Sequence, residues 1–350
     1  MKNRNLAIDF WKFVCALYLV FYHFAQLTGV NAFGIDYMNN FNLVEWFFII
    51  SGFMITTSDK NYFAKENVDK STGHRLLYRL KRIYPMFAIS VITAATIMYA
   101  YRLIFGEWWW NGQIHGIKNL VLSLFALTYS GIFQSDYILG INSPTWFIDA
   151  LIFSYAIYYF IIFLSRKLNF SRVYAYVAFM LLGFYAYYND IMLPFFNREL
   201  GRGYAAFFFG CVLYYVLEYV SDRKLKIGFF AAVSYLLFWK ILLGAEMLDD
   251  IYFIRGYIWG CAILILFVKF DIFNKIFSMI PGVDILGGAS YEVFLWHVPV
   301  LNIFYMIWKF IGKEDITSTD AIIFAVICEI VATFMYIFVE KKLYSKSSAC

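Results

Sequence analysis

Eleven apolar segments dominate this chain of 350 residues, with short polar stretches between them. A helix rises about 1.5 Å per residue, so about 20 apolar residues cross a bilayer core that is about 30 Å thick. Because 62% of the residues are hydrophobic and only 15% are charged, the chain has too little charge for a water-soluble protein of this length. We expect an all-α, polytopic membrane helical bundle. The apolar segments lie approximately at 6–28, 42–58, 84–105, 117–134, 146–165, 173–189, 203–220, 227–245, 255–270, 288–311 and 320–340.

The positions of lysine and arginine predict how these segments cross the membrane. Loops rich in these residues stay on the cytoplasmic side. Most of the 29 lysines and arginines fall into six clusters, at 2–4, 60–82, 166–172, 223–226, 269–275 and 341–346. All six clusters are cytoplasmic if the segment at 117–134 does not cross. We therefore expect ten transmembrane helices with both termini in the cytoplasm, and an outer stretch at 106–144 that carries one re-entrant or interfacial helix.

Composition also bounds the domain organisation and the partners. No repeat, low-complexity tract or linker interrupts the sequence, so we expect one integral-membrane domain over residues 1–350. The spacing of the five cysteines is not typical of a disulfide framework or a zinc site, and we expect no metal. The net charge of +5 is explained by membrane topology, and we expect no nucleic-acid partner.

A histidine inside the first apolar segment is the strongest candidate for chemistry. In the expected topology, His23 lies near the outer end of the segment at 6–28. A side chain that titrates near neutral pH is costly to place in a membrane, which favours a functional role such as a general base. The alternative is a histidine that packs between helices and bonds to a backbone carbonyl. Near the inner end, Asp9 and Lys12 are three residues apart and can pair on one helix face.

Several motifs resemble those of acyltransferase family 3, the integral-membrane O-acyltransferases. They follow the order of the family and are Ile8-Asp9-x-x-Lys12 with His23, Glu45-Trp46-Phe47-Phe48-Ile49-Ile50-Ser51-Gly52-Phe53, Arg79-x-x-Arg82-x-x-Pro85, Trp146-Phe147-Ile148, and Ser290-Tyr291 followed by His297-x-Pro299. Lys12 replaces the usual arginine, and Leu151 stands where many members have a glutamate. The resemblance implies transfer of an acyl group, commonly acetyl from cytoplasmic acetyl-CoA, to a hydroxyl of an extracytoplasmic glycan.

The expected catalytic region contains further polar residues. Glu45 lies near the outer end of the second segment, where a carboxylate could orient His23 and stabilise its imidazolium form; the alternative is a solvated interfacial acid. At Ser51 and Gly52 we favour a close helix or substrate approach over a serine nucleophile. Asp149 is the acid nearest to the position of the missing family glutamate, and we take it as a candidate for substrate binding.

The donor site is expected at a basic stretch before the third segment. Arg75, Arg79 and Arg82 are spaced by four and three residues, so a helix places them on one face. Guanidinium groups suit the phosphates of CoA, although lipid phosphates are the alternative ligand. Lys12 and His297 are further candidates for donor binding, with His297 reaching the acyl carbonyl or the pantetheine arm or, alternatively, only packing. The sequence lacks a glycine-rich phosphate motif, which argues against nucleotide hydrolysis.

Two tryptophans, the expected partners and one alternative function complete the prediction. Trp108 and Trp109 open the outer stretch and could stack on a sugar or anchor the membrane interface. The expected partners are acetyl-CoA, a cell-surface glycan or lipid-linked sugar, and membrane lipid, with the protein in the plasma membrane. The alternative function is a transporter that exports a polysaccharide or an acylated glycan. Such a transporter typically shows repeat symmetry and paired broken helices, which the sequence does not indicate.

Overall fold

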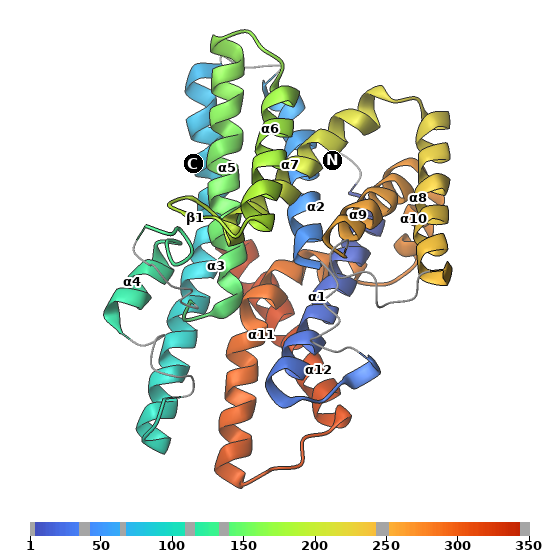
Figure 1. The fold of residues 1–350 in the computed structure, drawn as a ribbon. Coiled ribbons are helices and arrows are strands. Elements are labelled where there is room, and N and C mark those ends of the chain that lie inside the picture. The colour runs from blue at the N-terminus through green and yellow to red at the C-terminus, as the bar shows by residue number, and fades with distance from the viewer. Residues whose placement is uncertain are drawn as a thin grey trace. The chain divides into compact units, whose positions relative to one another are not determined.

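The computed structural model describes residues 4–34, 43–63, 68–108, 116–132, 140–242 and 252–343, and these residues are mostly helical (Figure 1). A helix suits an apolar solvent because it satisfies its own backbone hydrogen bonds. The α-helices are α1 (Leu6–Thr28), α2 (Leu43–Phe63), α3 (Val68–Phe105), α4 (Ile117–Leu124), α5 (Trp146–Lys167), α6 (Arg172–Tyr188), α7 (Arg198–Tyr219), α8 (Asp222–Leu242), α9 (Tyr252–Lys269), α10 (Asp271–Ser278), α11 (Val283–Ile311) and α12 (Ser318–Phe334).

Short elements join or extend these helices. They are the 3-10 turns η1 (Ala32–Gly34) and η2 (Ser143–Thr145), the π-helix η3 (Met335–Glu340), and the strands β1 (Met192–Leu193) and β2 (Phe196–Asn197). The two strands form an antiparallel hairpin between α6 and α7, with Met192 opposite Asn197. The element η3 directly continues α12.

The long helices make this a polytopic membrane protein. Each of the ten segments expected to cross lies mainly in a separate α-helix. Within the described ranges, six helices are long and apolar enough to span a membrane, and the number is seven if α9 and α10, which are bent by 79°, count as one span. The all-α membrane fold is therefore confirmed, while ten crossings and cytoplasmic termini stay predictions.

The segment at 117–134 behaves differently from the other apolar segments. Its helix, α4, has only eight residues and is about 12 Å long, which is less than half of a bilayer core. The chain then turns at Ala126, whose φ of 55° is left-handed. This segment therefore does not cross as a continuous helix, which agrees with the expected re-entrant or interfacial helix.

Contacts divide the chain into two units, each built from separate parts of the sequence. The first unit contains Met1–Ile8, Phe41–Tyr78 and Ala150–Pro281. The second contains Asp9–Asn40, Arg79–Asp149 and Gly282–Cys350. The unit boundaries fall inside α1, α3 and α5, so no sequence linker separates the units. The single domain expected over 1–350 stays a prediction.

Glycines in the first unit bring α2 and α7 into backbone contact. A Cβ atom at Gly52 would lie 1.9 Å from the carbonyl oxygen of Phe207, and one at Gly210 would lie 2.1 Å from that of Ile49. A side chain at either position would force the helices apart, because backbone atoms cannot yield as a flexible side chain can. The close approach expected at Ser51–Gly52 is thus present at Gly52.

Glycines also shape the second unit, where α11 meets α1 and η3. A Cβ atom at Gly287 would lie 2.4 Å from the carbonyl oxygen of Asp9, and one at Gly288 would lie 2.4 Å from the hydroxyl oxygen of Tyr336. Further along, the rings of Phe24 on α1 and Phe324 on α12 are 5.5 Å apart. These contacts fix α1 against the two C-terminal helices and so position the side chains of α1.

Candidate functional site

Two histidines meet in the second unit. His23 on α1 and His297 on α11 have ring centroids 4.9 Å apart, with an angle of 32° between the ring planes. His297 is fully buried, whereas His23 is half-buried. The structure therefore brings together two of the residues that the sequence marks as candidates, from opposite ends of the chain.

Hydrogen bonds determine which ring nitrogen of each histidine can act as a base. Nδ1 of His23 lies 3.0 Å from Oε1 of Gln26, and Nδ1 of His297 lies 3.0 Å from the carbonyl oxygen of Val293. A carbonyl or amide oxygen only accepts, so in both histidines the proton is on Nδ1 and Nε2 keeps its lone pair. Nε2 of His297 is buried and has no hydrogen-bond partner within the described residues. Each ring thus presents Nε2 as a proton acceptor.

Pro299, two residues after His297, deprives one carbonyl of α11 of its helical donor. Pro299 has no N–H, so the carbonyl of Leu295, four residues earlier, loses its helical donor. Nδ2 of Asn142 donates to this carbonyl at 3.0 Å and to Oγ of Ser90 at 3.3 Å. Asn142 is fully buried and thereby connects α11 to α3 near the histidine pair. Sequence reasoning missed Asn142, because nothing in the sequence shows which donor would reach that carbonyl.

The ion pair expected between Asp9 and Lys12 is present on α1. Nζ of Lys12 lies 2.7 Å from Oδ1 of Asp9, and the Asp9 side chain is only 5% exposed. The backbone of Asp9 packs against Gly287, so this pair is held at the start of α11. Lys12 remains 24% exposed and keeps donors for a further anion.

A buried pair of carboxyl groups, missed by sequence reasoning, lies near two donor-site candidates. Glu292 and Glu340 are both buried and interact electrostatically, and Nε1 of Trp296 donates to Oε2 of Glu292 at 2.9 Å. Glu340 also interacts electrostatically with Arg82 and Lys12. Arg82 and Lys12 therefore both lie near the Glu340 carboxyl group in the second unit.

The basic stretch forms the helix face expected from its spacing, because α3 runs unbroken through it. Arg75 is engaged inside the first unit. Its Nε and Nη2 donate to Oδ1 of Asp59 at 3.1 and 2.8 Å, and Tyr159 donates to Oδ2 of Asp59 at 2.7 Å. Arg79 is half-buried and Arg82 is exposed, both in the second unit. Arg82 is thus the more accessible of these two guanidinium groups.

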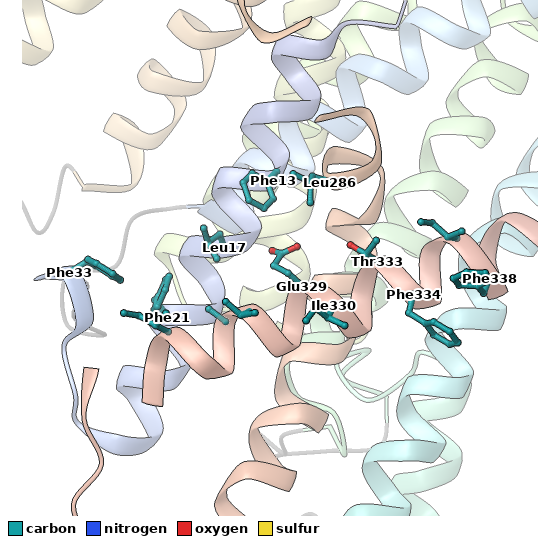
Figure 2. A pocket seen from close by; sticks show the side chains of 14 residues that line it. Phe13, Leu17, Phe21, Phe33, Leu286, Glu329, Ile330, Thr333, Phe334 and Phe338 are labelled. Carbon is teal, nitrogen blue, oxygen red and sulfur yellow. The ribbon is translucent and has the colours of Figure 1, made fainter. Parts of the chain in front are cut away.

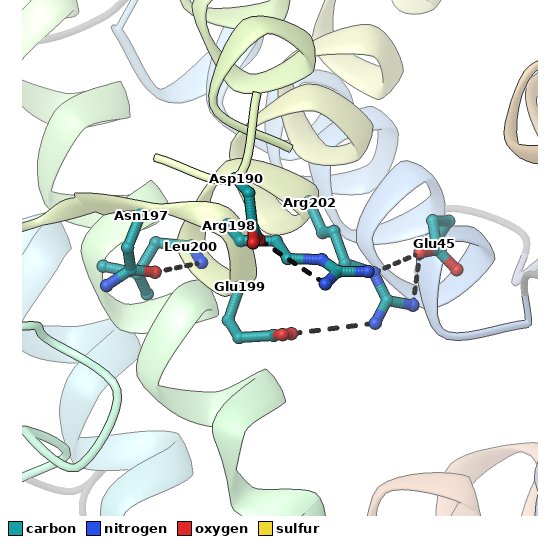
Figure 3. Close-up of polar contacts among 7 residues, drawn as sticks. All are labelled: Glu45, Asp190, Asn197, Arg198, Glu199, Leu200 and Arg202. Atoms are coloured by element: carbon teal, nitrogen blue, oxygen red, sulfur yellow. Dashed lines mark hydrogen bonds and ion pairs between the residues drawn. The ribbon is translucent and has the colours of Figure 1, made fainter. Parts of the chain in front are cut away.

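Glu45 forms an ion pair within the first unit (Figure 3). Nε of Arg202 donates to Oε1 of Glu45 at 2.8 Å, and Glu199 lies 3.7 Å from the same guanidinium. The Glu45 side chain is 1% exposed, which makes this a buried ion pair. Asn197 caps α7 by accepting from the N–H of Leu200 at 3.0 Å, which fixes the helix end that carries Arg202.

The partners found for His23 and Glu45 differ from the expected pair. His23 is oriented by Gln26, and Glu45 is held by Arg202. Glu45 belongs to the first unit and His23 to the second, and their pairing stays a prediction. Gln26 could have been found in the sequence, since a residue at i+3 shares the face of His23.

The remaining candidates lie in or next to residues 106–144, the stretch expected to be on the outer side. Asp149 is buried, and its Oδ2 accepts from the backbone N–H of Tyr129 at 3.2 Å, so it holds the chain that follows α4. Trp108 packs on Tyr99, at 5.4 Å, and under Arg102, at 4.3 Å. Next to it, a hydrogen bond from Lys309 lowers the pKa of Glu107. Trp109 lies outside the described residues.

Apolar helices that enclose a pair of proton-accepting imidazoles define a multi-pass membrane protein with a site suited to acid–base chemistry. Comparison with known families agrees with this class. The chain belongs to acyltransferase family 3, because the family model, described as an acyltransferase domain, matches residues 5–339. No curated protein and no solved structure gives a significant match. The protein is therefore a membrane acyltransferase.

Proposed function

We propose that this protein transfers an acetyl group from cytoplasmic acetyl-CoA to a hydroxyl of an extracytoplasmic glycan or glycolipid at the plasma membrane. The observation that carries the proposal is the contact between His23 and His297, with both Nδ1 atoms bonded to acceptors. Transfer to an alcohol needs a base for the hydroxyl proton, and a neutral imidazole with a free Nε2 provides one. Family membership supplies the reaction class, acyl transfer.

The transfer can be written with the half-buried histidine as the base. Nε2 of His23 takes the proton of the acceptor hydroxyl while the oxygen attacks the thioester carbonyl. The C–S bond breaks, and the CoA thiolate receives that proton from His23. Gln26 keeps the Nδ1 proton in place and stabilises the imidazolium form. The neighbouring His297 stays neutral during this step, because two positive charges at 4.9 Å repel each other.

The donor side of the proposal rests on the cations of the second unit. Arg79, Arg82 and Lys12 would bind the phosphates of CoA, since guanidinium and ammonium groups form strong charged hydrogen bonds with phosphate. Arg75 is given a different role, because its guanidinium already donates to Asp59, which Tyr159 also holds, within the first unit. We propose that Arg75 orients the basic face of α3.

The direct test uses purified protein in liposomes with [14C]acetyl-CoA and a glycolipid acceptor. We expect label to appear on the glycolipid, and mass spectrometry to find it as an alkali-labile ester. Label should move only when acetyl-CoA faces the side of the membrane that carries Arg82. Transfer from the opposite side alone would show that the donor side is wrong, and no transfer with any acyl-CoA would overturn the proposed function.

The donor site gives a second prediction. Replacing Arg79 and Arg82 by alanine should weaken CoA binding by about 1.5–3 kcal/mol each, the scale of a charged hydrogen bond. Calorimetric titration with CoA measures this change. Lys81→Ala is the matched control, because Lys81 is exposed on the same helix. It is two residues from Arg79 and one from Arg82, so it does not share their helix face. Equal CoA affinity in the double mutant and in K81A would place the donor elsewhere.

A further inference from the structure

A proline interrupts α11 at the turn that carries His297. Pro299 has no N–H, so the carbonyl of Leu295 has no donor within the helix. His297 lies midway between these two residues, in the turn whose hydrogen bond is missing. This turn is held less firmly than its neighbours, because a helix depends on its i to i−4 bonds. The position of the His297 ring therefore depends on what replaces the bond.

The amide of Asn142 replaces the missing bond. Its Nδ2 donates to the Leu295 carbonyl at 3.0 Å, which is a normal hydrogen-bond distance, and to Oγ of Ser90 at 3.3 Å. The orientation of the amide is fixed, because a carbonyl only accepts and Oδ1 could not take the place of Nδ2. The side chains of Asn142 and Leu295 are both fully buried, so the bond is shielded from solvent.

The chain around Asn142 holds this amide in place. The backbone carbonyl of Asn142 accepts from the N–H of Thr145 at 3.0 Å and from Oγ1 of Thr145 at 2.6 Å. Pro144 lies in the same turn, η2, where its ring restricts the backbone. On α3, Oγ of Ser90 donates to the carbonyl of Phe87 at 2.8 Å. Asn142 is thus fixed between α3 and the start of α5, and it gives α11 a rigid support.

The cost of this arrangement indicates a role beyond stability. Oδ1 of Asn142 is buried and accepts no hydrogen bond within the described ranges, which is unfavourable for a polar atom. Any residue other than proline at position 299, with an apolar residue at position 142, would avoid both this atom and the missing helical bond. The combination of Asn142 with Pro299 is therefore explained better by the position that it gives to His297.

The ring held in this way is the one that contacts His23. Nδ1 of His297 bonds to the carbonyl of Val293 at 3.0 Å, and the ring centroids of His297 and His23 are 4.9 Å apart. Rings at this separation are in contact, so movement of the turn that carries His297 would shift the His23 ring or leave a gap beside it. A general base must lie about 2.6–3.2 Å from the atom whose proton it takes, so small shifts matter.

The other face of α1 gives His23 no comparable support. Side chains of α1 as far as Phe21 line an apolar groove between α1 and α12 (Figure 2). Phe21 and His23 are two residues apart, which places their side chains on nearly opposite faces of the helix. The His23 ring instead meets Tyr22, Gln26 and His297. Of these, only His297 comes from another helix, so the relative position of α1 and α11 decides where the base lies.

We propose that Asn142 is a positioning residue for the histidine pair: it supplies the hydrogen bond that Pro299 removes from α11, and so keeps His297 packed against His23. The inference rests on the proposed function for the use of His23 as a base, whereas the positioning itself does not. Asn142 acts through α11 and not on the reacting atoms. Its loss should therefore lower kcat and leave KM for acetyl-CoA nearly unchanged.

The test removes the amide and then returns the missing donor through the backbone. Asn142→Ala deprives the Leu295 carbonyl of its donor, and Pro299→Ala restores an N–H that can bond to this carbonyl. Ser154→Ala is the matched control. Ser154 is equally buried and donates to the carbonyl of Ala150 at 2.7 Å, but that carbonyl lies in α5, where the backbone donor is retained. Each variant is made with proline and with alanine at position 299.

With Pro299 present, N142A should lower kcat by at least about tenfold, the scale for a buried acceptor that loses its hydrogen bond. In the P299A background, the same change should lower kcat by at most about twofold. S154A should cost at most about twofold in both backgrounds. An equal loss from N142A in the two backgrounds, or a loss confined to KM, would overturn the proposal.

Ser90→Ala provides a milder form of the same test. It removes one of the two bonds of Nδ2 and leaves the amide of Asn142 in place. Single-turnover transfer should fall by about threefold with Pro299 present and should be unaffected by the change in the P299A background. This comparison decides the question even if N142A does not fold, because an equal loss in both backgrounds would again contradict the assigned role.

A spectroscopic measurement separates the inference from the proposed function. With histidine isotope-labelled at its ring nitrogens, the NMR signals of His297, identified by their absence in His297→Gln, report its tautomer and its Nδ1 hydrogen bond. They should shift and broaden in N142A and return in N142A/P299A. Such recovery in a protein that transfers no acyl group would support the positioning and remove the proposed function. Unchanged His297 signals in N142A would overturn the positioning even if acyl transfer is observed.

Discussion

Replacing His23 by alanine is expected to lower acyl transfer by about 10²–10⁴-fold, the range for loss of a general base. The reason is geometric: in the described residues His23 is the half-buried member of the histidine pair, and Gln26 fixes its Nδ1 proton so that Nε2 keeps its lone pair as an acceptor. CoA affinity should stay within about twofold, because the cations proposed to bind its phosphates, Arg79, Arg82 and Lys12, are other residues of the second unit. Single-turnover transfer of labelled acetyl, with CoA titration alongside, measures both quantities.

Two further variants show whether the base acts as the structure indicates. Gln26→Ala should reduce transfer by about tenfold and leave CoA affinity unchanged, because it removes only the hydrogen bond that orients His23. Gln26→Glu should recover activity, since a carboxylate accepts from Nδ1 more strongly than an amide does. Wild-type transfer by His23→Ala protein of normal abundance would contradict the assignment of the base.

Local patterns in the sequence predicted the parts of this protein that depend on short spacing. Ten of the eleven apolar segments correspond to long helices, and the pair Asp9–Lys12 forms at the i,i+3 spacing that predicts it. The unbroken helix through Arg75, Arg79 and Arg82 follows from the same kind of reasoning. In each case the information lies within one or two turns, where helix geometry fixes which side chains are neighbours.

Contacts between distant segments could not be predicted in the same way. The contact between the rings of His23 and His297 depends on how α1 meets α11, which the glycine contact at Gly287 sets. Pro299 means that the carbonyl of Leu295 lacks its helical donor. Only the folded chain shows that Nδ2 of Asn142 donates to this carbonyl. Glu45 was expected to orient a histidine, yet its buried carboxylate bonds to Arg202, a partner that no spacing rule indicates. Tertiary packing decides such partners, and an apolar sequence offers many equivalent ways to pack.

The ion pair between Glu45 and Arg202 gives the second large expected effect, a loss of stability. Arg202→Ala should destabilise the protein by about 3–5 kcal/mol, because it leaves the buried Glu45 carboxylate without its cation. Glu45→Ala should cost less, because Glu199 still lies 3.7 Å from the Arg202 guanidinium. The double replacement Glu45→Leu with Arg202→Leu should recover most of the loss, since apolar side chains can replace a buried pair at little net cost. Denaturant unfolding in mixed micelles measures these free energies.

The ion pair between Asp190, in the turn before β1, and Arg198, the first residue of α7, is the matched control. Asp190 and Arg198 are 3.5 Å apart and are 64% and 43% exposed, so Asp190→Ala should cost at most about 1 kcal/mol. If Arg202→Ala costs no more than Asp190→Ala, its pair with Glu45 does not stabilise the first unit. If instead Arg202→Leu alone still transfers acetyl but the folded double leucine variant does not, the Glu45 carboxylate itself is needed for the reaction. That result would return Glu45 to the catalytic role expected from the sequence, because stability alone cannot account for a loss of chemistry in a folded protein.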